Sequence, residues 1–298
     1  MDLADPRALE NVLRRHGIRA ATGLGQRFLV DRVALGAIVD AAELEGADGA
    51  RTGLATPAKH DVLEVGPGPG VLTAALADRA RSVTAVEIDE RMVAVLADTL
   101  ADRPNVRIVR ADALAVDLYA LGDRPPDRIV ANLPYQITTP LLERFLADPR
   151  RPPLVVVLVQ EEVARRMVAA AGNEKAPRER GYLSVFVQSF ADARIVRRVP
   201  ARSFRPAPRV SSAIVALRTR ATPAFAPLEQ RAFLRFVSDA FRHRRKQLRS
   251  ALGHEAGVDR ERAEHALNTA GIDPRRRPEE LAVSEWVALA SELGIAHG

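Results

Sequence analysis

The stretch Val62-Leu63-Glu64-Val65-Gly66-Pro67-Gly68-Pro69-Gly70, followed by Val71-Leu72-Thr73, decides the fold of this chain. An apolar run that leads into closely spaced glycines predicts a buried strand, a tight turn and the start of a helix. Glycines let the backbone approach a ligand closely, and the start of a helix offers unpaired N–H groups. The spacing is G-x-G-x-G, which differs from the G-x-G-x-x-G of dinucleotide-binding proteins. The turn therefore predicts a small-molecule site and argues against NAD, although such a turn can also be a plain connection.

Strand-like and helix-like segments alternate on both sides of this turn. We predict strands at residues 61–65, 82–87, 106–110, 128–131 and 154–160. We predict helices at residues 71–80, 89–101, 139–147 and 161–171. Residues 154–159 are apolar at every position, as expected of a strand that is buried on both faces. This alternation predicts a mostly parallel sheet that is covered by helices on both faces.

The pattern changes in the last third of the chain. Residues 193–199 and 210–217 are strand candidates without a helix-length segment between them, which predicts a hairpin at the sheet edge. After residue 220 the predicted elements are helices, at 228–252, 260–270 and 283–293. We therefore predict an α/β domain over residues 1–220 and a small all-helical domain over residues 221–298. Residues 48–59 are predicted to form a loop, to which we assign no role.

The composition excludes several kinds of site. The 298 residues include no cysteine, so the chain has no disulfide, no thiolate metal site and no cysteine nucleophile. Its six histidines show no metal-ligand spacing, and we expect no metal. No apolar run approaches the length of a membrane span, and the N-terminus lacks the pattern of a secretory signal. We expect a cytoplasmic protein that does not associate with membranes.

The formal net charge of +6 favours an anionic partner such as nucleic acid. Lysine is rare, however, whereas arginine and alanine abound, as GC-rich coding would produce. Charge alone therefore does not decide between a nucleic-acid partner and a compositional bias.

Acidic residues follow the next two predicted strands. Glu87 ends the second strand about 20 residues beyond the glycine turn, where doubly wound folds place an acid that holds a ribose. Asp89 suits the start of a helix better. Asp112, after the third strand, can accept from an adenine amine or can cap a helix. Together with the glycines, these acids predict a site for S-adenosylmethionine. The predicted cofactor ligands from these elements are Gly66, Gly68, Gly70, Glu87 and Asp112.

The fourth predicted strand ends in Asn132-Leu133-Pro134-Tyr135, which resembles the signature of methyltransferases that act on exocyclic amines. The lone pair of adenine N6 is delocalised, so N6 is a poor nucleophile. The amide oxygen of Asn132 and the carbonyl of Leu133 or Pro134 can accept the two N6 hydrogens and aim the lone pair at a methyl group. Tyr135 offers a ring on which an extruded base can stack. The motif predicts catalysis by positioning; its alternative is an ordinary turn before a helix.

From about Gly25 to Leu293, the chain resembles the small-subunit rRNA adenine N6,N6-dimethyltransferase family (the KsgA type). The segments that carry the resemblance are residues 25–31, 64–73, 87–89, 112–113, 132–140, 204–213, 241–252 and 271–281. The resemblance implies a Rossmann-like class I methyltransferase domain with S-adenosylmethionine as cofactor. It also implies dimethylation of two adjacent adenosines in the 3′-terminal hairpin of small-subunit rRNA, on the assembling small ribosomal subunit. We expect the protein to act as a monomer.

The resemblance adds further residues to the predicted site. It implies cofactor contacts from Arg27, Leu29 and Asn132, besides Gly66, Glu87 and Asp112. The family usually has Asn where Arg27 stands, although arginine can still pair with the cofactor carboxylate. It also implies that Phe204 is a second aromatic wall for the target base; the alternative is a core phenylalanine near a hairpin.

A run of cationic residues lies in the predicted C-terminal domain. Residues 241–249 place five cations within about two turns of a predicted helix. These are Arg242, Arg244, Arg245, Lys246 and Arg249. We interpret them as a surface that binds the RNA backbone, although such a run can also be a solvated face. Residues 275–277, a second arginine run, can equally decorate a loop. Because aromatic residues make up only 4% of the chain, we expect recognition by RNA shape and phosphates.

Three alternative functions stay open. The first is an adenine methyltransferase for large-subunit rRNA of the macrolide-resistance type; Leu133 and residues 271–281 favour the small-subunit family instead. The second is a non-catalytic RNA-binding assembly factor, which would be expected to lose motif residues that are all present here. These are Glu87, Asp112, Asn132 and Tyr135. The third is an NAD-dependent dehydrogenase, against which the motif at Asn132 and the cationic run argue.

Overall fold

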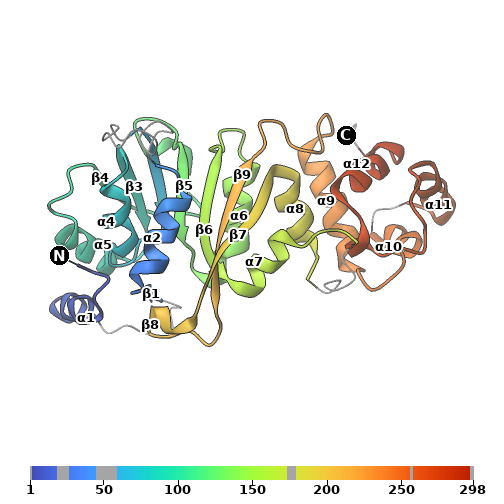
Figure 1. The fold of residues 1–298 in the computed structure, drawn as a ribbon. Helices are drawn as coiled ribbons and strands as arrows, with labels where there is room; N and C mark the ends of the chain where they lie inside the picture. Colours follow the sequence, from blue (N-terminus) through green and yellow to red (C-terminus); the bar gives the residue numbers. More distant parts are fainter. Residues whose placement is uncertain (1, 19–26, 45–58, 173–178, 256–257, 296–298) are drawn as a thin grey trace, which may run out of the picture. The chain divides into compact units, whose positions relative to one another are not determined.

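The computed structural model describes residues 2–18, 27–44, 59–172, 179–255 and 258–295 (Figure 1). The chain forms two compact units, Met1–Ala164 with Arg194–Thr219, and Arg165–Ala193 with Arg220–Gly298. It therefore passes between the units after residues 164, 193 and 219, whereas the sequence suggested one boundary near residue 220. Helix α8 (Tyr182–Phe190) belongs to the second unit because it packs on helices from beyond that point.

A seven-stranded sheet forms the centre of the first unit (Figure 1). Its strands are β2 (Asp61–Val65), β3 (Ser82–Glu87), β4 (Val106–Arg110), β5 (Arg128–Asn132), β6 (Leu154–Gln160), β7 (Ala191–Val199) and β9 (Ser212–Thr219). Their order across the sheet is β4-β3-β2-β5-β6-β9-β7. The first five strands in this order pair in parallel, and β9 is antiparallel to β6. This confirms the predicted Rossmann-like fold, with β9 and β7 at the sheet edge.

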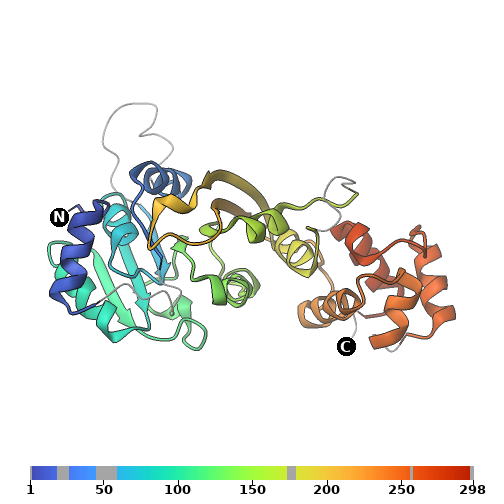
Figure 2. The same ribbon diagram turned by 90° about the horizontal axis from the view of Figure 1, so that it is seen from below.

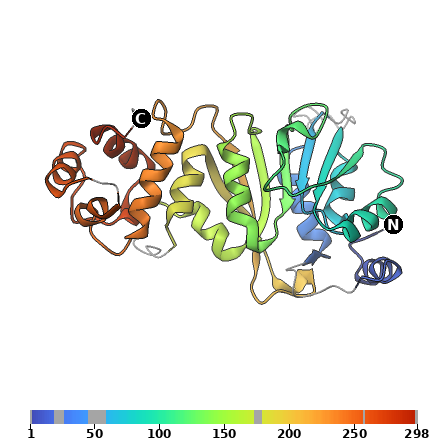
Figure 3. The same cartoon turned by 180° about the vertical axis from the view of Figure 1, so that it is seen from behind.

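Helices cover both faces of this sheet (Figures 2 and 3). The helices of the first unit are α1 (Pro6–Arg15), α2 (Arg32–Ala41), α4 (Val71–Ala77), α5 (Glu90–Thr99) and α6 (Thr138–Ala147); α7 (Glu161–Val168) starts there and ends in the second unit. On one face, α2 and α4 bury Ile38 and Leu76 against the strand residues Val83 and Val156. Helix α6 lies on the opposite face (Figures 1 and 3). This layered packing leaves the carboxyl ends of the parallel strands open for a site.

A short second sheet joins two parts of the first unit that lie far apart in the sequence. Strand β1 (Phe28–Leu29) pairs antiparallel with β8 (Phe204–Arg205), so that Leu29 lies opposite Phe204. The connection between β7 and β9 therefore carries a strand of its own, and it is longer than a simple hairpin turn. The pairing places the residues that precede α2 beside the glycine turn.

The second unit consists of helices in the part of the chain that the structure describes. Besides α8, they are α9 (Gln230–Arg242), α10 (Leu248–Glu255), α11 (Arg260–Thr269) and α12 (Val283–Glu292). Its core is aromatic: Phe190 contacts Phe225, which stacks on Phe233, and Phe236 meets Trp286 edge to face. This confirms the predicted small helical region. None of the described helices is long and apolar enough to cross a membrane.

The single helix predicted over residues 228–252 is wrong. Helix α9 ends at Arg242 and α10 begins at Leu248. The N–H groups of Leu248 and Arg249 donate to the carbonyls of Arg276 and Pro274, at 2.8 and 3.4 Å. In a continuous helix they would donate four residues back along the chain. A neighbouring loop therefore takes the donors that would have continued α9.

Candidate active site

A pocket of about 550 Å³ opens at the carboxyl ends of the central strands in the first unit. Its lining comes from five segments, at residues 27–29, 64–72 except Gly70, 86–89, 111–114 and 132–137. Ten predicted site residues line it: Arg27, Leu29, Gly66, Gly68, Glu87, Asp112, Asn132, Leu133, Pro134 and Tyr135. Two others, Gly70 and Phe204, are not among the lining residues. Residues 48–58 of the loop predicted at 48–59, and Gly25 and Gln26, lie outside the described residues.

Glycine is required at two positions of the turn for different structural reasons. Gly68 has φ +56°, and a Cβ atom there would lie 3.2 Å from the ring of Phe28. Gly70 has φ +89°, and a Cβ atom would lie 3.1 Å from Leu96 of α5. Both backbone conformations favour glycine. Gly68 therefore keeps the pocket wall thin, whereas Gly70 lets α4 start close to α5 and does not face the pocket.

Glu87 is buried and held by the main chain. Its carboxylate accepts hydrogen bonds from the N–H groups of Gly68 (3.2 Å), Ile88 (2.9 Å) and Asp89 (2.9 Å). Burial raises the pKa of Glu87, and these N–H groups partly offset that shift. The bonds connect the glycine turn to the end of β3, so the carboxylate is oriented before any ligand arrives. Asp89 is the N-cap of α5, as expected of an acid at a helix start.

Glu64 is an acid that sequence reasoning missed. It lies in the middle of the apolar run of β2, is 1% exposed and lines the pocket. Burial raises the pKa of Glu64 to about 8. The neighbouring Thr73 hydroxyl lowers this pKa in part, but its geometry is not that of a hydrogen bond, and Oε2 makes none among the described residues. A buried acceptor without a donor is costly, so the site fits a ligand that brings an N–H group. An acid between Leu63 and Val65 was the signal that could have revealed it.

Two further pocket residues, Asp112 and Ile88, offer a polar and an apolar contact. The Oδ1 atom of Asp112 accepts from the N–H of Leu114 at 2.8 Å, which fixes the turn after β4. Ile88 is 65% exposed although it is large and apolar, and it lies in the pocket lining beside Glu87. An exposed isoleucine at this point offers a flat apolar surface for a ring. Sequence reasoning passed over Ile88 because it read this segment for acids.

The turn after β5 presents the predicted acceptors. The Asn132 amide donates through Nδ2 to the carbonyl of Arg27 at 3.3 Å, which leaves its amide oxygen able to accept. The carbonyl of Pro134 already accepts from the Thr138 hydroxyl (3.0 Å) and from the N–H of Ile137 (3.2 Å). Of the two carbonyls that the sequence left open, that of Leu133 is therefore the better acceptor for a substrate amine.

Tyr135 forms one wall of the pocket with a fixed ring. Its hydroxyl lies 2.8 Å from the Oγ of Ser212, which is fully buried at the start of β9. Burial raises the pKa of Tyr135, so the phenol stays neutral. Ser212 was not predicted, because only the fold brings it next to a residue 77 positions earlier.

Phe204 does not lie where the resemblance implied. It is fully buried in the core cluster that includes Leu29 and Ile38, because its pairing with β1 turns the ring inward. The prediction of a second aromatic pocket wall therefore fails in this structure, and the alternative of a core phenylalanine describes it. The aromatic residue that accompanies Tyr135 in the pocket lining is Phe28.

The cationic run of the second unit lies mostly in a turn and not on a helix. Arg242 ends α9, residues 244–246 lie between the two helices, and Arg249 lies in the first turn of α10. Arg242, Arg244, Arg245 and Lys246 are exposed, and Arg249 is half-buried. The hydrogen bonds from Leu248 and Arg249 to the loop at residues 274–276 bring the second arginine run beside the first. In the second run Arg276 is half-buried and paired with Glu285, whereas Arg275 and Arg277 are exposed. We call the exposed cations of the two runs the basic turn.

A pocket of this construction at the carboxyl edge of a Rossmann-like sheet defines a methyltransferase. The chain belongs to the ribosomal RNA adenine dimethylase family, whose model matches residues 17–294. The predicted enzyme class is thereby confirmed.

Known relatives agree along the whole chain. The ribosomal RNA small subunit methyltransferase A of Geobacillus thermodenitrificans is 38% identical over 98% of this chain and 97% of its own length. That of Pelotomaculum thermopropionicum is 39% identical over 99% of both chains. Among solved structures, the 23S rRNA methyltransferase ErmE has a TM-score of 0.64 at 30% identity, covering 90% of this chain and 99% of its own. A dimethyladenosine transferase from Plasmodium falciparum has a TM-score of 0.70 at 22% identity over 90% of this chain and 97% of its own, and supports the fold.

Proposed function

We propose that this protein transfers methyl groups from S-adenosylmethionine to N6 of two adjacent adenosines in the 3′-terminal hairpin of small-subunit rRNA, during ribosome biogenesis. The observation that carries the proposal is the meeting of two turns at one pocket, the glycine turn and the turn that begins at Asn132. Relatives named ribosomal RNA small subunit methyltransferase A, at 38–39% identity over nearly the full chain, support the small subunit as the source of the substrate.

The residues around the pocket fit the parts of S-adenosylmethionine. Glu87 suits the ribose hydroxyls, Ile88 suits a face of the adenine ring, and Asp112 suits the adenine amine. The partnerless Oε2 of Glu64 suits the ammonium group of the methionine part, and the guanidinium of Arg27 suits its carboxylate. When bound, the cofactor supplies an electrophilic methyl group on a sulfonium.

The turn after β5 activates the substrate amine. The amide oxygen of Asn132 and the carbonyl of Leu133 accept the two N6 hydrogens, which draws the lone pair out of the adenine ring and towards the cofactor. The ring of Tyr135 stacks on the extruded base and holds it in line. After the first transfer only one N6 hydrogen is left, so a single acceptor suffices to orient the monomethylated amine for the second.

The second unit supplies the RNA contacts in this proposal. The predicted RNA-binding residues are Arg242, Arg244, Arg245, Lys246 and Arg249. The exposed charges of Arg242, Arg244, Arg245 and Lys246 track phosphates without reading base edges, and the half-buried Arg249 adds to them from the first turn of α10. Within the described ranges, no cluster of three or more side chains that could hold a metal ion is found. We propose a monomeric, cytoplasmic, metal-independent enzyme whose catalytic part is residues 1–220 and whose RNA-binding part is residues 221–298.

Methyl transfer to isolated ribosomal subunits tests the proposal. The protein is incubated with labelled S-adenosylmethionine and with small or large ribosomal subunits that lack N6,N6-dimethyladenosine. The labelled nucleoside is then identified. We expect N6,N6-dimethyladenosine at two adjacent positions of small-subunit RNA. Label confined to large-subunit RNA would overturn the choice of substrate, and label on neither subunit would overturn the enzymatic proposal.

A further inference from the structure

One side of the pocket is the segment that follows β4, which leaves the sheet after Ala111, whose N–H donates to the carbonyl of Glu87 at 3.0 Å. Residues 111–114 follow β4 and line the pocket through Asp112 and Leu114. Inside the segment, the N–H groups of Ala115 and Val116 donate to the carbonyl of Asp112, at 2.9 and 3.0 Å. The bond from Ala111 ties the start of the segment to β3, whereas these local bonds shape the turn without tying its far end to the rest of the pocket.

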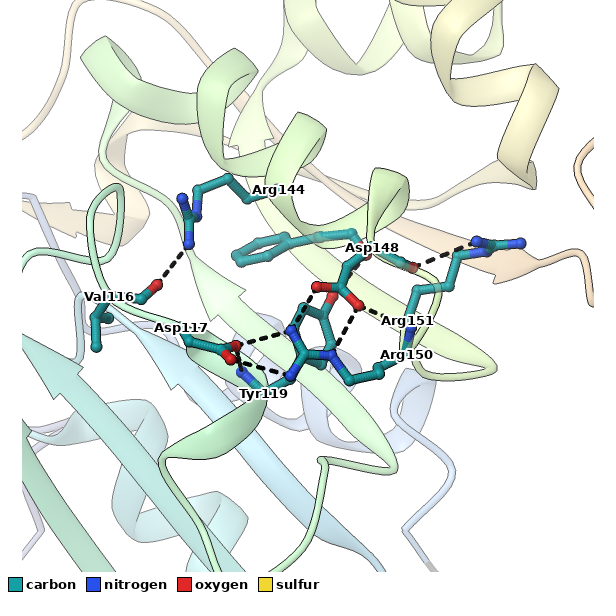
Figure 4. Close-up of polar contacts among 8 residues, drawn as sticks. Val116, Asp117, Tyr119, Arg144, Asp148, Arg150 and Arg151 are labelled. Carbon is teal, nitrogen blue, oxygen red and sulfur yellow. Dashed lines mark hydrogen bonds and ion pairs between the residues drawn. The ribbon is translucent and has the colours of Figure 1, made fainter. Parts of the chain in front are cut away.

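Arg144 of α6 attaches this segment to the body of the first unit (Figure 4). Its guanidinium donates through Nη1 to the carbonyl of Leu114 at 2.7 Å and through Nη2 to the carbonyl of Val116. The side chain is half-buried, and its Nε has no hydrogen-bond partner among the described residues. Arg144 therefore directs a rigid fork of donors at two main-chain carbonyls of the pocket segment.

The same helix begins at the other side of the pocket. Helix α6 follows directly on the turn that carries Asn132 and Tyr135, and the Thr138 hydroxyl in its first turn bonds the carbonyl of Pro134. A helix is stiff over this length. Arg144 therefore links the far end of the segment that carries Asp112 to the helix that follows the turn proposed to hold the target base.

A second set of contacts joins the same two segments farther from the pocket (Figure 4). The hydroxyl of Tyr119 donates to the carbonyl of Phe145 at 2.8 Å. Arg150 binds Asp117 and Asp148 and lies 5.0 Å above the ring of Tyr119. None of these residues lines the pocket. This outer contact provides a control, because its loss disturbs the same helix and loop without releasing Leu114.

We propose that Arg144 is a positioning residue for cofactor binding, which acts by holding Leu114, and with it Asp112, against the pocket. The inference rests on the proposed use of S-adenosylmethionine at this site. Lysine cannot replace the arginine fully, because a single ammonium group does not span two carbonyls as a planar fork does.

Binding of S-adenosylhomocysteine to the full-length protein tests this role by calorimetry, together with thermal unfolding and the KM and kcat of methyl transfer. For Arg144→Gln we expect about tenfold weaker binding and a similar rise in the cofactor KM, with a smaller change in kcat. Arg144→Lys keeps the charge, and its affinity for S-adenosylhomocysteine should lie between that of Arg144→Gln and that of the unaltered protein. For Arg150→Gln we expect a lower Tm, because the contacts to Asp117, Asp148 and Tyr119 are lost together. Binding should stay within about twofold of the unaltered protein, because none of these residues lines the pocket.

Two outcomes would overturn the inference alone. One is unchanged binding in both Arg144 variants. The other is an equal loss of binding in Arg150→Gln at the same loss of Tm, which would make Arg144 merely structural. If the unaltered protein itself bound no S-adenosylhomocysteine, the proposed function would fail and the inference with it, so that the two failures are distinguishable.

Discussion

The pocket and the basic turn use polar residues in opposite ways. In the pocket, Glu87 is nine-tenths buried and accepts from three main-chain N–H groups, and Leu133 is buried with its N–H bonded to β6. In the basic turn, Arg244, Arg245 and Lys246 are exposed. Buried groups act through fixed geometry, so one lost atom has a large effect, whereas exposed charges act as a sum that salt screens. The comparison teaches that chemistry and substrate binding should respond differently to substitution.

The largest expected effect is a loss of methyl transfer on substitution of Asn132, which should affect the pocket and not the basic turn. Asn132→Ala removes the amide oxygen that accepts from N6, and we expect methyl transfer to fall by about 100- to 1000-fold. RNA binding, measured by filter retention, should stay close to that of the unaltered protein. An equal loss of transfer and RNA binding would contradict the role given to Asn132.

A second prediction concerns the buried acid of the pocket. The pKa of Glu64 rises from 4.5 to about 8 on folding, so the folded protein keeps a proton that the unfolded chain releases. Stability is then fully present below pH 4.5 and falls by about 1 kcal/mol for each pH unit up to about 8. Glu64→Gln should flatten this dependence in thermal unfolding of the cofactor-free protein between pH 6 and 8, and should weaken S-adenosylhomocysteine binding. An unchanged pH slope in this variant would show that Glu64 is already ionised.

A third prediction tests the fixed ring of the pocket. Tyr135→Phe and Ser212→Ala each remove one partner of the same contact, and we expect each to lower kcat by about three- to tenfold. Because both act through that contact, the double variant should be no worse than either single variant. Multiplicative losses would mean that Ser212 acts independently of Tyr135.

The smallest expected effects belong to the basic turn. Arg244→Ala or Arg245→Ala should weaken RNA binding by about two- to fivefold and reduce the salt dependence by about one unit each. The kcat at saturating RNA should not change. Arg235→Ala, an exposed cation elsewhere on α9, serves as the matched control. A loss of kcat in the basic-turn variants would contradict the separation between the two regions.

The part of the fold that sequence predicted best is the parallel sheet. The bounds of β2, β3, β4 and β6 agree with the predictions, because each strand is a short run rich in β-branched residues between turn residues. Helix α8 was missed although its apolar residues Leu183, Phe186, Val187 and Phe190 follow the i, i+3, i+4, i+7 spacing of a helix, so the signal was present in the sequence. The pairing of β1 with β8 involves two residues of each strand and leaves no periodic signal.

The candidate site was predictable where a residue follows a strand. Glu87, Asp112 and Asn132 stand at strand ends, and parallel strands bring such ends together. Ser212 was not predictable, because it reaches the site only through the antiparallel strand β9. Arg144 was not predictable either, because it binds main-chain carbonyls, which every residue type carries. Phe204 shows the opposite error, since an aromatic residue in a suggestive segment was drawn into the core by its pairing with Leu29.

The contact between Tyr135 and Ser212 also has a consequence for synthesis on the ribosome. The segments that surround the proposed cofactor are complete once the chain reaches about residue 137, whereas Ser212 comes 77 residues after Tyr135. A nascent chain therefore contains every cofactor-side segment of the pocket before it contains the residue that fixes the base-side ring. The contact that fixes the wall proposed for the target adenine is therefore made after all the residues that line the pocket.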